Sequence, residues 1–127
     1  MKNLILAILV PLIFMSCSTK NIDSETFIKL TKLVDSGKYE TALPIFDSLS
    51  TIYDDKNLKA AHVRSLVLYG NYLMYESDFP PKVKYPGALK QYKQALQIDP
   101  NNTEARENAK LITSIYSQMG REIPEQN

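Results

Sequence analysis

Few side chains in this sequence could carry out covalent or acid–base chemistry. The chain has one histidine, His62, and one cysteine, Cys17. No serine, cysteine or carboxylate motif around His62 predicts a general base or a triad, so we interpret it as a partly buried surface histidine. Asp54 and Asp55 are followed by no further spaced oxygen ligands of the kind that calcium needs, and we interpret them as a helix cap. The sequence therefore predicts neither an enzyme nor a metal or cofactor site.

Length and charge narrow the class of protein further. The chain has 127 residues, enough for one small domain. Its formal net charge is +1, and positive and negative residues are interleaved. A nucleic-acid surface needs lysine and arginine clustered on one face. We therefore expect no nucleic-acid partner and, with so little site chemistry, no small-molecule substrate.

The first residues form a separate apolar segment. Lys2 is followed by an uninterrupted apolar run from Leu4 to Met15, which is too short to span a bilayer because a spanning helix needs about 20 residues. The run ends in Ser16-Cys17-Ser18. An exported chain with one thiol has no disulfide partner within itself, so Cys17 needs another explanation. The pattern predicts a targeting segment that takes no part in the fold.

This end of the chain resembles the lipobox of bacterial lipoproteins, in which a small residue precedes a lone cysteine. The resemblance implies a signal peptide over residues 1–16, a lipid on Cys17, and a short tether over residues 17–22. Ser18 is not the aspartate that retains some lipoproteins at the inner membrane, which implies a lipid-anchored protein of the bacterial cell envelope, on the outer membrane. Two alternatives remain open: an ordinary signal-peptidase site that releases a secreted protein, or a short uncleaved anchor.

The stretch from Tyr85 to Ala109 has the clearest helical pattern. Pro86 suits the first turn of a helix, and Asp99-Pro100 ends that helix because proline cannot continue the hydrogen-bond ladder. Asn101 or Asn102 can then cap a second helix. The stretch therefore predicts a tight helical pair with a proline-marked corner. Its apolar residues follow the i, i+3/i+4, i+7 spacing of one helical face, with small residues that allow close approach: Ala88, Leu89, Tyr92, Ala95 and Leu96.

This spacing resembles the second half of a tetratricopeptide repeat (TPR) and the corner that follows it. The stretch Leu66-x-x-Tyr69-Gly70-x-x-Leu73 resembles the first half of the same repeat, and residues 37–49 resemble another second half. The alternative is an antiparallel helical hairpin of no particular family. The resemblance implies an all-α fold over residues 23–119: a short right-handed α-solenoid of about two TPR-like helical hairpins plus a C-terminal capping helix.

The remaining helices are predicted from apolar stripes, caps and breakers. Asp23 or Ser24 can cap the first helix, Gly37 suits the left-handed corner after it, and Gly120 ends the last helix. The expected helices cover about residues 24–36, 39–53, 56–76 and 102–119, and residues 120–127 are expected to be a flexible tail.

Three prolines and a glycine within residues 78–87 predict a stiff extended loop instead of a helix. This loop offers Phe79, Lys82 and Lys84 as candidate binding residues. In the alternative interpretation, the loop only spans a gap between helices.

In the TPR family, the first helix of each pair lines a concave groove that holds a peptide or a helix of a partner. Only Arg64 and Asn71 could contribute to the carboxylate clamp of the peptide-binding members, so no clamp is predicted. The groove is expected to suit an amphipathic helix or a hydrophobic segment. Each groove residue could instead pack in the core. Carried over by matching repeats, the groove face comprises Phe27, Thr31, Val34, Arg64, Val67, Asn71, Met74 and Tyr75.

The sequence therefore predicts a membrane-anchored adaptor or scaffold of the bacterial cell envelope. It would bind a partner protein or peptide through a concave helical groove. The alternative is an accessory subunit of an envelope enzyme or transport complex that folds only with its partner, because two repeats and a cap are close to the lower limit for independent folding.

Overall fold

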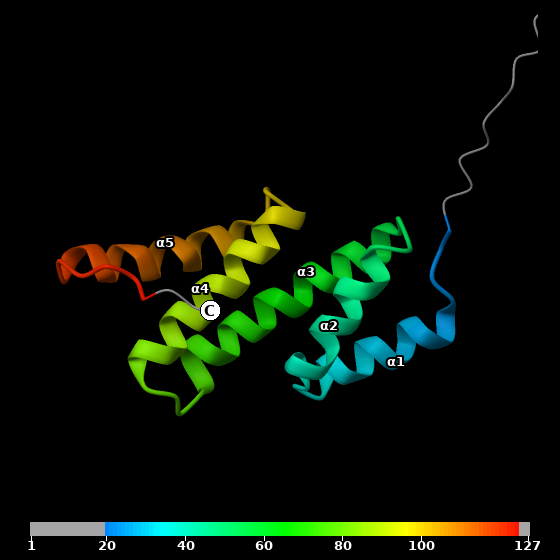
Figure 1. The fold of residues 1–127 in the computed structure, drawn as a ribbon, viewed down its shortest axis with the longest axis horizontal. Helices are drawn as coiled ribbons and strands as arrows, with labels where there is room; N and C mark the ends of the chain where they lie inside the picture. The colour runs from blue at the N-terminus through cyan, green and yellow to red at the C-terminus, as the bar shows by residue number, and fades with distance from the viewer. Residues whose placement is uncertain (1–19, 125–127) are drawn as a thin grey trace, which may run out of the picture.

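Helices follow one another across the molecule, from α1 at one end to α5 at the other (Figure 1). The computed structural model describes residues 20–124. Within this range there is no strand, and the helices pack as a short α-solenoid, so the predicted all-α fold is confirmed. The elements are α1 (Ser24–Asp35), α2 (Tyr39–Ser50), α3 (Lys56–Asn71), the π-helical segment η1 (Tyr72–Glu76), α4 (Pro81–Ile98) and α5 (Thr103–Gln118).

The caps lie where the sequence predicts them. Side-chain oxygens of Asp23, Asp55 and Asn102 accept hydrogen bonds from backbone N–H groups in the first turns of α1, α3 and α5. These bonds satisfy donors that have no partner within the helix. Gly37 and Gly120 have φ of 70° and 61° at two predicted helix ends, a left-handed conformation that glycine adopts without steric cost. Short-range capping thus defines the starts of α1, α3 and α5 and the ends of α1 and α5.

The predicted loop over residues 78–87 is wrong for most of its length, because α4 already begins at Pro81. Pro80 has the extended conformation of a helix N-cap, and Pro81 occupies the first helical position, where its missing N–H costs no intrahelical bond. The N–H group of Lys84 donates to the carbonyl of Pro80 at 3.0 Å. The two adjacent prolines therefore start a helix instead of excluding one.

Pro86 also lies deeper in α4 than predicted. It belongs to the second turn and not the first, and its ring is buried. Proline has no N–H to donate to the carbonyl of Lys82, four residues earlier, so α4 lacks one hydrogen bond at this point. Lys82 is exposed, so water can solvate its carbonyl.

The end of α3 departs from ordinary helical geometry. The helix continues through η1 to the predicted end at Glu76. The N–H of Ser77 donates to the carbonyl of Tyr72 at 2.9 Å, and the Ser77 hydroxyl donates to the carbonyl of Leu73 at 2.7 Å. Ser77 therefore satisfies the carbonyl groups of the first two residues of the π-helical segment.

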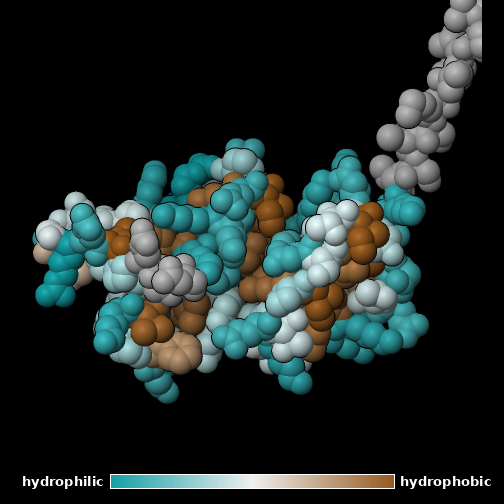
Figure 2. Space-filling view, in the orientation of Figure 1, coloured by the Kyte–Doolittle hydropathy of each residue, from teal (hydrophilic) through white to brown (hydrophobic). Residues whose placement is uncertain are grey.

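Two apolar cores hold the helices together. The larger core lies between α3, η1, α4 and α5 around Tyr92, and the smaller lies between α1, α2 and the start of α3 around Phe46. Ala88 and Ala95 on α4 have 0% exposure, and their small side chains allow α3 and α5 to pack closely on this helix, as predicted. Figure 2 shows apolar side chains gathered in the seams between hydrophilic helix faces.

The segment after Gly120 turns back onto the domain. The N–H of Arg121 donates to the carbonyl of Tyr116 at 3.0 Å, and Ile123 packs against the larger core. The first part of the segment predicted to be a flexible tail is therefore in contact with the helices. Residues 125–127 lie outside the described range.

Candidate functional site

A groove of about 590 Å³ lies between α3 and the corner that joins α4 to α5. We call it the α3–α5 groove. Val63 and Val67 form the deepest part of its apolar lining, since both are 6% exposed. The lining comprises the apolar residues Ala60, Val63, Val67, Leu68 and Ile98, the charged residues Lys59 and Arg64 on α3 and Asp99 and Glu104 at the corner, and Asn102.

The corner forms one wall of the groove, and its sequence explains its position. Pro100 cannot continue α4, and the Asp99 carboxylate accepts a hydrogen bond from the N–H of Asn101 at 3.0 Å. Asn102 then caps α5, which begins at Thr103. Because the chain reverses within these few residues, the end of α4 and the start of α5 both face α3.

A hydrogen-bond network ties α3 to α5 beside the groove. The amide nitrogen of Asn71 donates to Glu104 at 2.7 Å, and the amide oxygen of Asn71 accepts from the Tyr92 hydroxyl at 2.7 Å and from Asn108 at 3.1 Å. Burial raises the pKa of Tyr92 well above its usual value of 10.0, so its hydroxyl stays protonated and remains a donor. The two helices that flank the groove are therefore held at a defined separation.

The cationic side chains of the groove are in exposed ion pairs. Arg64 Nη1 lies 3.1 Å from Asp35 Oδ1 on α1, and Lys59 pairs with Asp54. All four side chains are more than half exposed, and such pairs stabilise a fold by only about 0–1 kcal/mol. Lys59 and Arg64 can therefore exchange these carboxylates for carboxylates of a bound partner at little cost.

The structure brings only part of the predicted groove face together. Arg64 and Val67 line the α3–α5 groove. Asn71 lies in the hydrogen-bond network, and the exposed Tyr75 donates to Asn108 at 3.3 Å. Asn71 thus positions the helices that form the groove.

The other predicted groove residues lie elsewhere. Val34 and Met74 are 2% and 5% exposed and pack in the smaller and the larger core, respectively. Phe27 and Thr31 are half-buried on α1 and do not belong to the lining. Val34 and Met74 therefore pack in the core, as the alternative interpretation of the groove residues predicts.

Sequence reasoning missed the wall formed by Ile98, Asp99, Asn102 and Glu104. The repeat pattern predicts a groove on the first helices of the two repeats and a capping role for the last helix. The Asp99-Pro100 corner is predicted as a helix break, and a break that reverses the chain also presents its residues to the preceding helix. That signal could have indicated the second wall.

Of the three candidate binding residues in the predicted loop, one lies in a connection and two lie in a helix. Phe79 lies in the connection between η1 and α4 and is 48% exposed. Lys82 and Lys84 lie in the first turn of α4, and Lys84 Nζ is 5.4 Å from the ring centroid of Tyr85. The predicted binding loop is therefore replaced by a helix start beside an exposed phenylalanine.

His62 lies in a second hollow, of about 330 Å³, between α2, α3 and α4. The imidazole stacks on Phe46 with centroids 5.1 Å apart, and its Nε2 is 3.4 Å from Asp47 Oδ1. It is only 5% exposed, more buried than predicted. Burial lowers the pKa of His62 from 6.5, and the Asp47 carboxylate opposes this shift without cancelling it.

We expect this burial to make stability depend on pH. Between the lowered pKa of the folded state and the ordinary value of 6.5, the unfolded chain binds more protons than the folded protein. The free energy of unfolding therefore decreases as the pH falls through this window, and the contribution of neutral His62 is fully present only above the window. Urea unfolding at about pH 7.5 and about pH 5.5 should therefore show a larger loss for the wild type than for His62→Gln. Equal losses would contradict the prediction.

Between residues 20 and 124, no group of three or more His, Cys, Asp or Glu side chains could hold a metal ion. Over the same residues, each helix is too short or too polar to span a lipid bilayer. Cys17 and the predicted signal peptide lie outside the described residues.

Comparison with known proteins bears on part of the chain. Residues 84–109, which extend from the first turn of α4 through the corner into α5, match the family model described as TPR repeat. Searches of curated proteins and of solved structures found no match. The family match confirms the TPR resemblance over this stretch and supports a role in protein–protein interaction.

Proposed function

We propose that this protein is an adaptor of the bacterial cell envelope that is anchored by a lipid on Cys17 and binds a helix of a partner protein in the α3–α5 groove. The groove carries this proposal, because it combines an apolar lining with charged walls of opposite sign. The TPR match covers the corner that forms one of these walls.

The chemistry of the lining favours an amphipathic helix as the occupant. Val63, Val67 and Ile98 can receive the apolar stripe of such a helix. Lys59 and Arg64 face acidic residues of the partner on one side, and Asp99 and Glu104 face basic residues on the other. Opposite charges on the two walls favour one orientation of the bound helix.

A carboxylate clamp for a free chain end is not part of this proposal. Both polar ends of the Asn71 amide are engaged, with Glu104 and with the Tyr92 hydroxyl. A terminal carboxylate would have to displace these bonds. The groove is therefore better suited to an internal helical segment than to a chain terminus.

Site-specific crosslinking tests the groove. A photoreactive residue at position 60, which is exposed and lines the groove, is expected to capture a partner in cells. Ile98→Glu places a charge on the apolar lining and should reduce the yield about tenfold, the equivalent of about 1.4 kcal/mol.

Leu111→Glu is the matched control for this experiment. Leu111 is 46% exposed and Ile98 is 37% exposed, so both substitutions add a surface charge, but Leu111 does not line the groove. Its yield should equal that of the wild type. Equal losses for the two variants, or no loss for Ile98→Glu, would argue against binding in the groove.

The lipid anchor is tested separately by metabolic labelling with a fatty acid. We expect the wild type to incorporate the label and Cys17→Ala to incorporate none, because the thiol is the attachment point. Two or three acyl chains, at about 0.8 kcal/mol per buried methylene, would keep the protein on a membrane. Ser18→Ala serves as control and should be labelled normally. Equal labelling of wild type and Cys17→Ala would contradict the anchor.

Independent folding distinguishes the adaptor from a subunit that folds only with its partner. Two apolar cores and side-chain caps on three helices favour an adaptor that is folded before it binds. The purified protein is then expected to unfold in one cooperative transition. A broad transition that becomes sharp only with the partner would favour the subunit.

A further inference from the structure

Another hollow, of about 260 Å³, opens between the start of α2 and the end of α3. Its lining includes Phe79 and three tyrosines. We call the surface formed by Tyr39, Tyr69 and Tyr72 the tyrosine surface. Ring centroids are 5.4 Å apart for Tyr39 and Tyr69 and 6.4 Å apart for Tyr69 and Tyr72, with interplanar angles of 26° and 16°. Tyr72 is 38% and Phe79 is 48% exposed, so part of this aromatic area is accessible to a ligand.

The π-helical segment contributes to this hollow. Tyr72 is the first residue of η1, and Phe79 comes shortly after the segment ends. π-Helical turns are rare and are often found at functional sites. Here the π turn lies at the rim of an aromatic hollow. The hollow shares no lining residue with the α3–α5 groove, so binding at the tyrosine surface does not depend on the proposed function.

The carboxylate of Glu40 lies beside the tyrosine surface. The Tyr69 hydroxyl donates to Glu40 Oε1 at 2.7 Å. Burial, with help from Glu40, raises the pKa of Tyr69 well above 10.0, so the hydroxyl remains a donor at neutral pH. A phenol that donates to a carboxylate has a more electron-rich ring, which attracts cations more strongly to its face.

Two charged residues line the hollow, Glu40 and Lys38. Burial raises the pKa of Tyr39, and the Glu76 carboxylate, which does not belong to the lining, adds to this shift. Arg64 and Asp35 also act on Tyr39 but are paired with each other at 3.1 Å. The carboxylate with which a cation can pair inside the hollow is therefore that of Glu40, which the Tyr69 hydroxyl holds in place.

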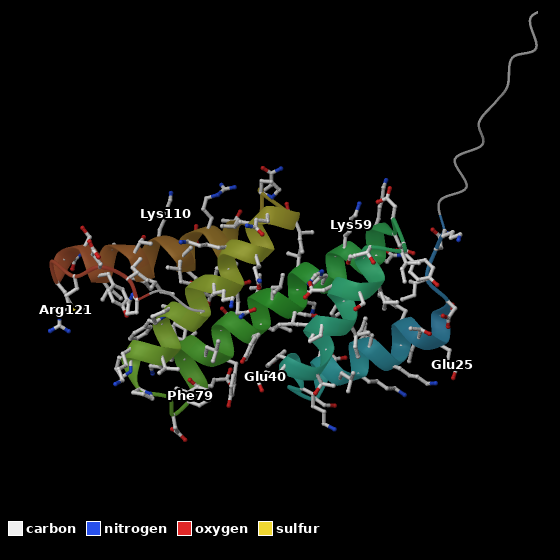
Figure 3. All side chains as sticks on the ribbon, in the orientation of Figure 1. Glu25, Glu40, Lys59, Phe79, Lys110 and Arg121 are labelled. Atoms are coloured by element: carbon white, nitrogen blue, oxygen red, sulfur yellow. The ribbon has the colours of Figure 1, made fainter. Side chains whose placement is uncertain are left out.

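We propose that the tyrosine surface binds an arginine side chain of a partner protein, with its guanidinium against the tyrosine rings and paired with Glu40. A guanidinium is planar and weakly hydrated, stacks on aromatic faces and pairs with carboxylates. A lysine ammonium is more strongly hydrated and cannot stack. A proline-rich segment would use the rings alone, and an apolar segment would desolvate Glu40 without pairing it. Figure 3 shows Glu40 and Phe79 on the same edge of the molecule.

The test uses the full chain in detergent micelles, labelled at its tyrosines, and N-acetyl-arginine amide as the probe. NMR titration is expected to show saturable shifts of the Tyr39, Tyr69 and Tyr72 ring signals, with a midpoint on the order of millimolar. N-acetyl-citrulline amide has the same shape without the charge and should give no saturable shift. Glu40→Gln, which keeps an acceptor for Tyr69, should raise the midpoint about tenfold.

Controls make the outcome decisive. Glu25→Gln removes an exposed carboxylate on α1 that does not line the hollow and should leave the midpoint unchanged. Tyr72→Leu removes one partly exposed ring and should also weaken binding. Equal shifts with arginine and citrulline, tighter binding of a tetraproline peptide, or an unchanged midpoint in Glu40→Gln would each overturn the proposal.

Discussion

Replacing Tyr92 by alanine is expected to lower the free energy of unfolding by about 3–5 kcal/mol, the range for removing a large buried aromatic side chain. The ring has 0% exposure at the centre of the larger core. Its removal leaves a cavity between three helices that cannot all collapse onto it. A small domain has a total stability of about 5–15 kcal/mol, so the variant should be close to unfolding. Urea denaturation followed by circular dichroism measures the loss.

Tyr92→Phe separates the ring from its hydroxyl. The hydroxyl donates to Asn71 at 2.7 Å, but Asn71 also accepts from Asn108 at 3.1 Å. The amide oxygen of Asn71 therefore keeps a donor, and the Met74 sulfur, 3.8 Å from the hydroxyl, is only a weak acceptor. We expect a loss of only about 0.5–1.5 kcal/mol. Similar losses for the alanine and phenylalanine variants would show that hydrogen bonding, and not packing of the ring, is the main contribution of Tyr92.

Replacing Gly70 by alanine is expected to destabilise the fold by about 1–2 kcal/mol, although alanine is the better helix former by about 1 kcal/mol. A Cβ atom at this position would lie 2.6 Å from Cε1 of Tyr92. The ring is fully buried and held by its hydroxyl, so it cannot move away. Overpacking typically costs about 1–3 kcal/mol or more and here exceeds the gain in helix propensity. Urea unfolding again measures the outcome.

Gly87→Ala is the matched control on α4. Its Cβ would meet Leu73 Cδ1 at 3.4 Å, an ordinary contact, so helix propensity decides the sign and a gain of up to about 1 kcal/mol is expected. A double-mutant cycle adds a second check. In a Tyr92→Ala background, Gly70→Ala should become neutral or stabilising. A persistent loss in that background would rule out the clash as its cause.

Gly70 and Tyr92 also connect stability to function. The close approach of α3 and α4 at Gly70 places the Tyr92 hydroxyl within reach of Asn71. Asn71 in turn binds Glu104 on α5, which lines the α3–α5 groove. The separation of the groove walls thus depends on a glycine that does not itself line the groove.

The helices and most of their bounds could be predicted from the sequence because their signals act locally. A cap such as Asp55 or Asn102 bonds to N–H groups within the next three residues, and a left-handed glycine such as Gly37 ends a helix on its own. The Ala88 and Ala95 stripe likewise predicted close packing without reference to any partner helix. The family match over residues 84–109 confirms the TPR resemblance in the stretch where these local signals are densest.

The two prolines at 80 and 81 show where local signals become ambiguous. The same residues can form an extended loop or start a helix, because the fixed φ angle of proline is compatible with both conformations. The choice was decided by tertiary packing. Pro86, Ala88 and Leu89 are buried, and Ala88 and Leu89 belong to the larger core. A helix that begins at Pro81 presents them to the interior.

By itself, the sequence determined an all-α chain, its corners and its main buried positions, since these depend on bonds and spacings within a few residues. Tertiary structure alone decided which side chains share a surface. Arg64 and Glu104 line one groove together, and Tyr39 stacks on Tyr69 in another hollow. These residues are far apart in the chain, and their proximity depends on the angles between helices, which result from packing across both cores and have no local signature.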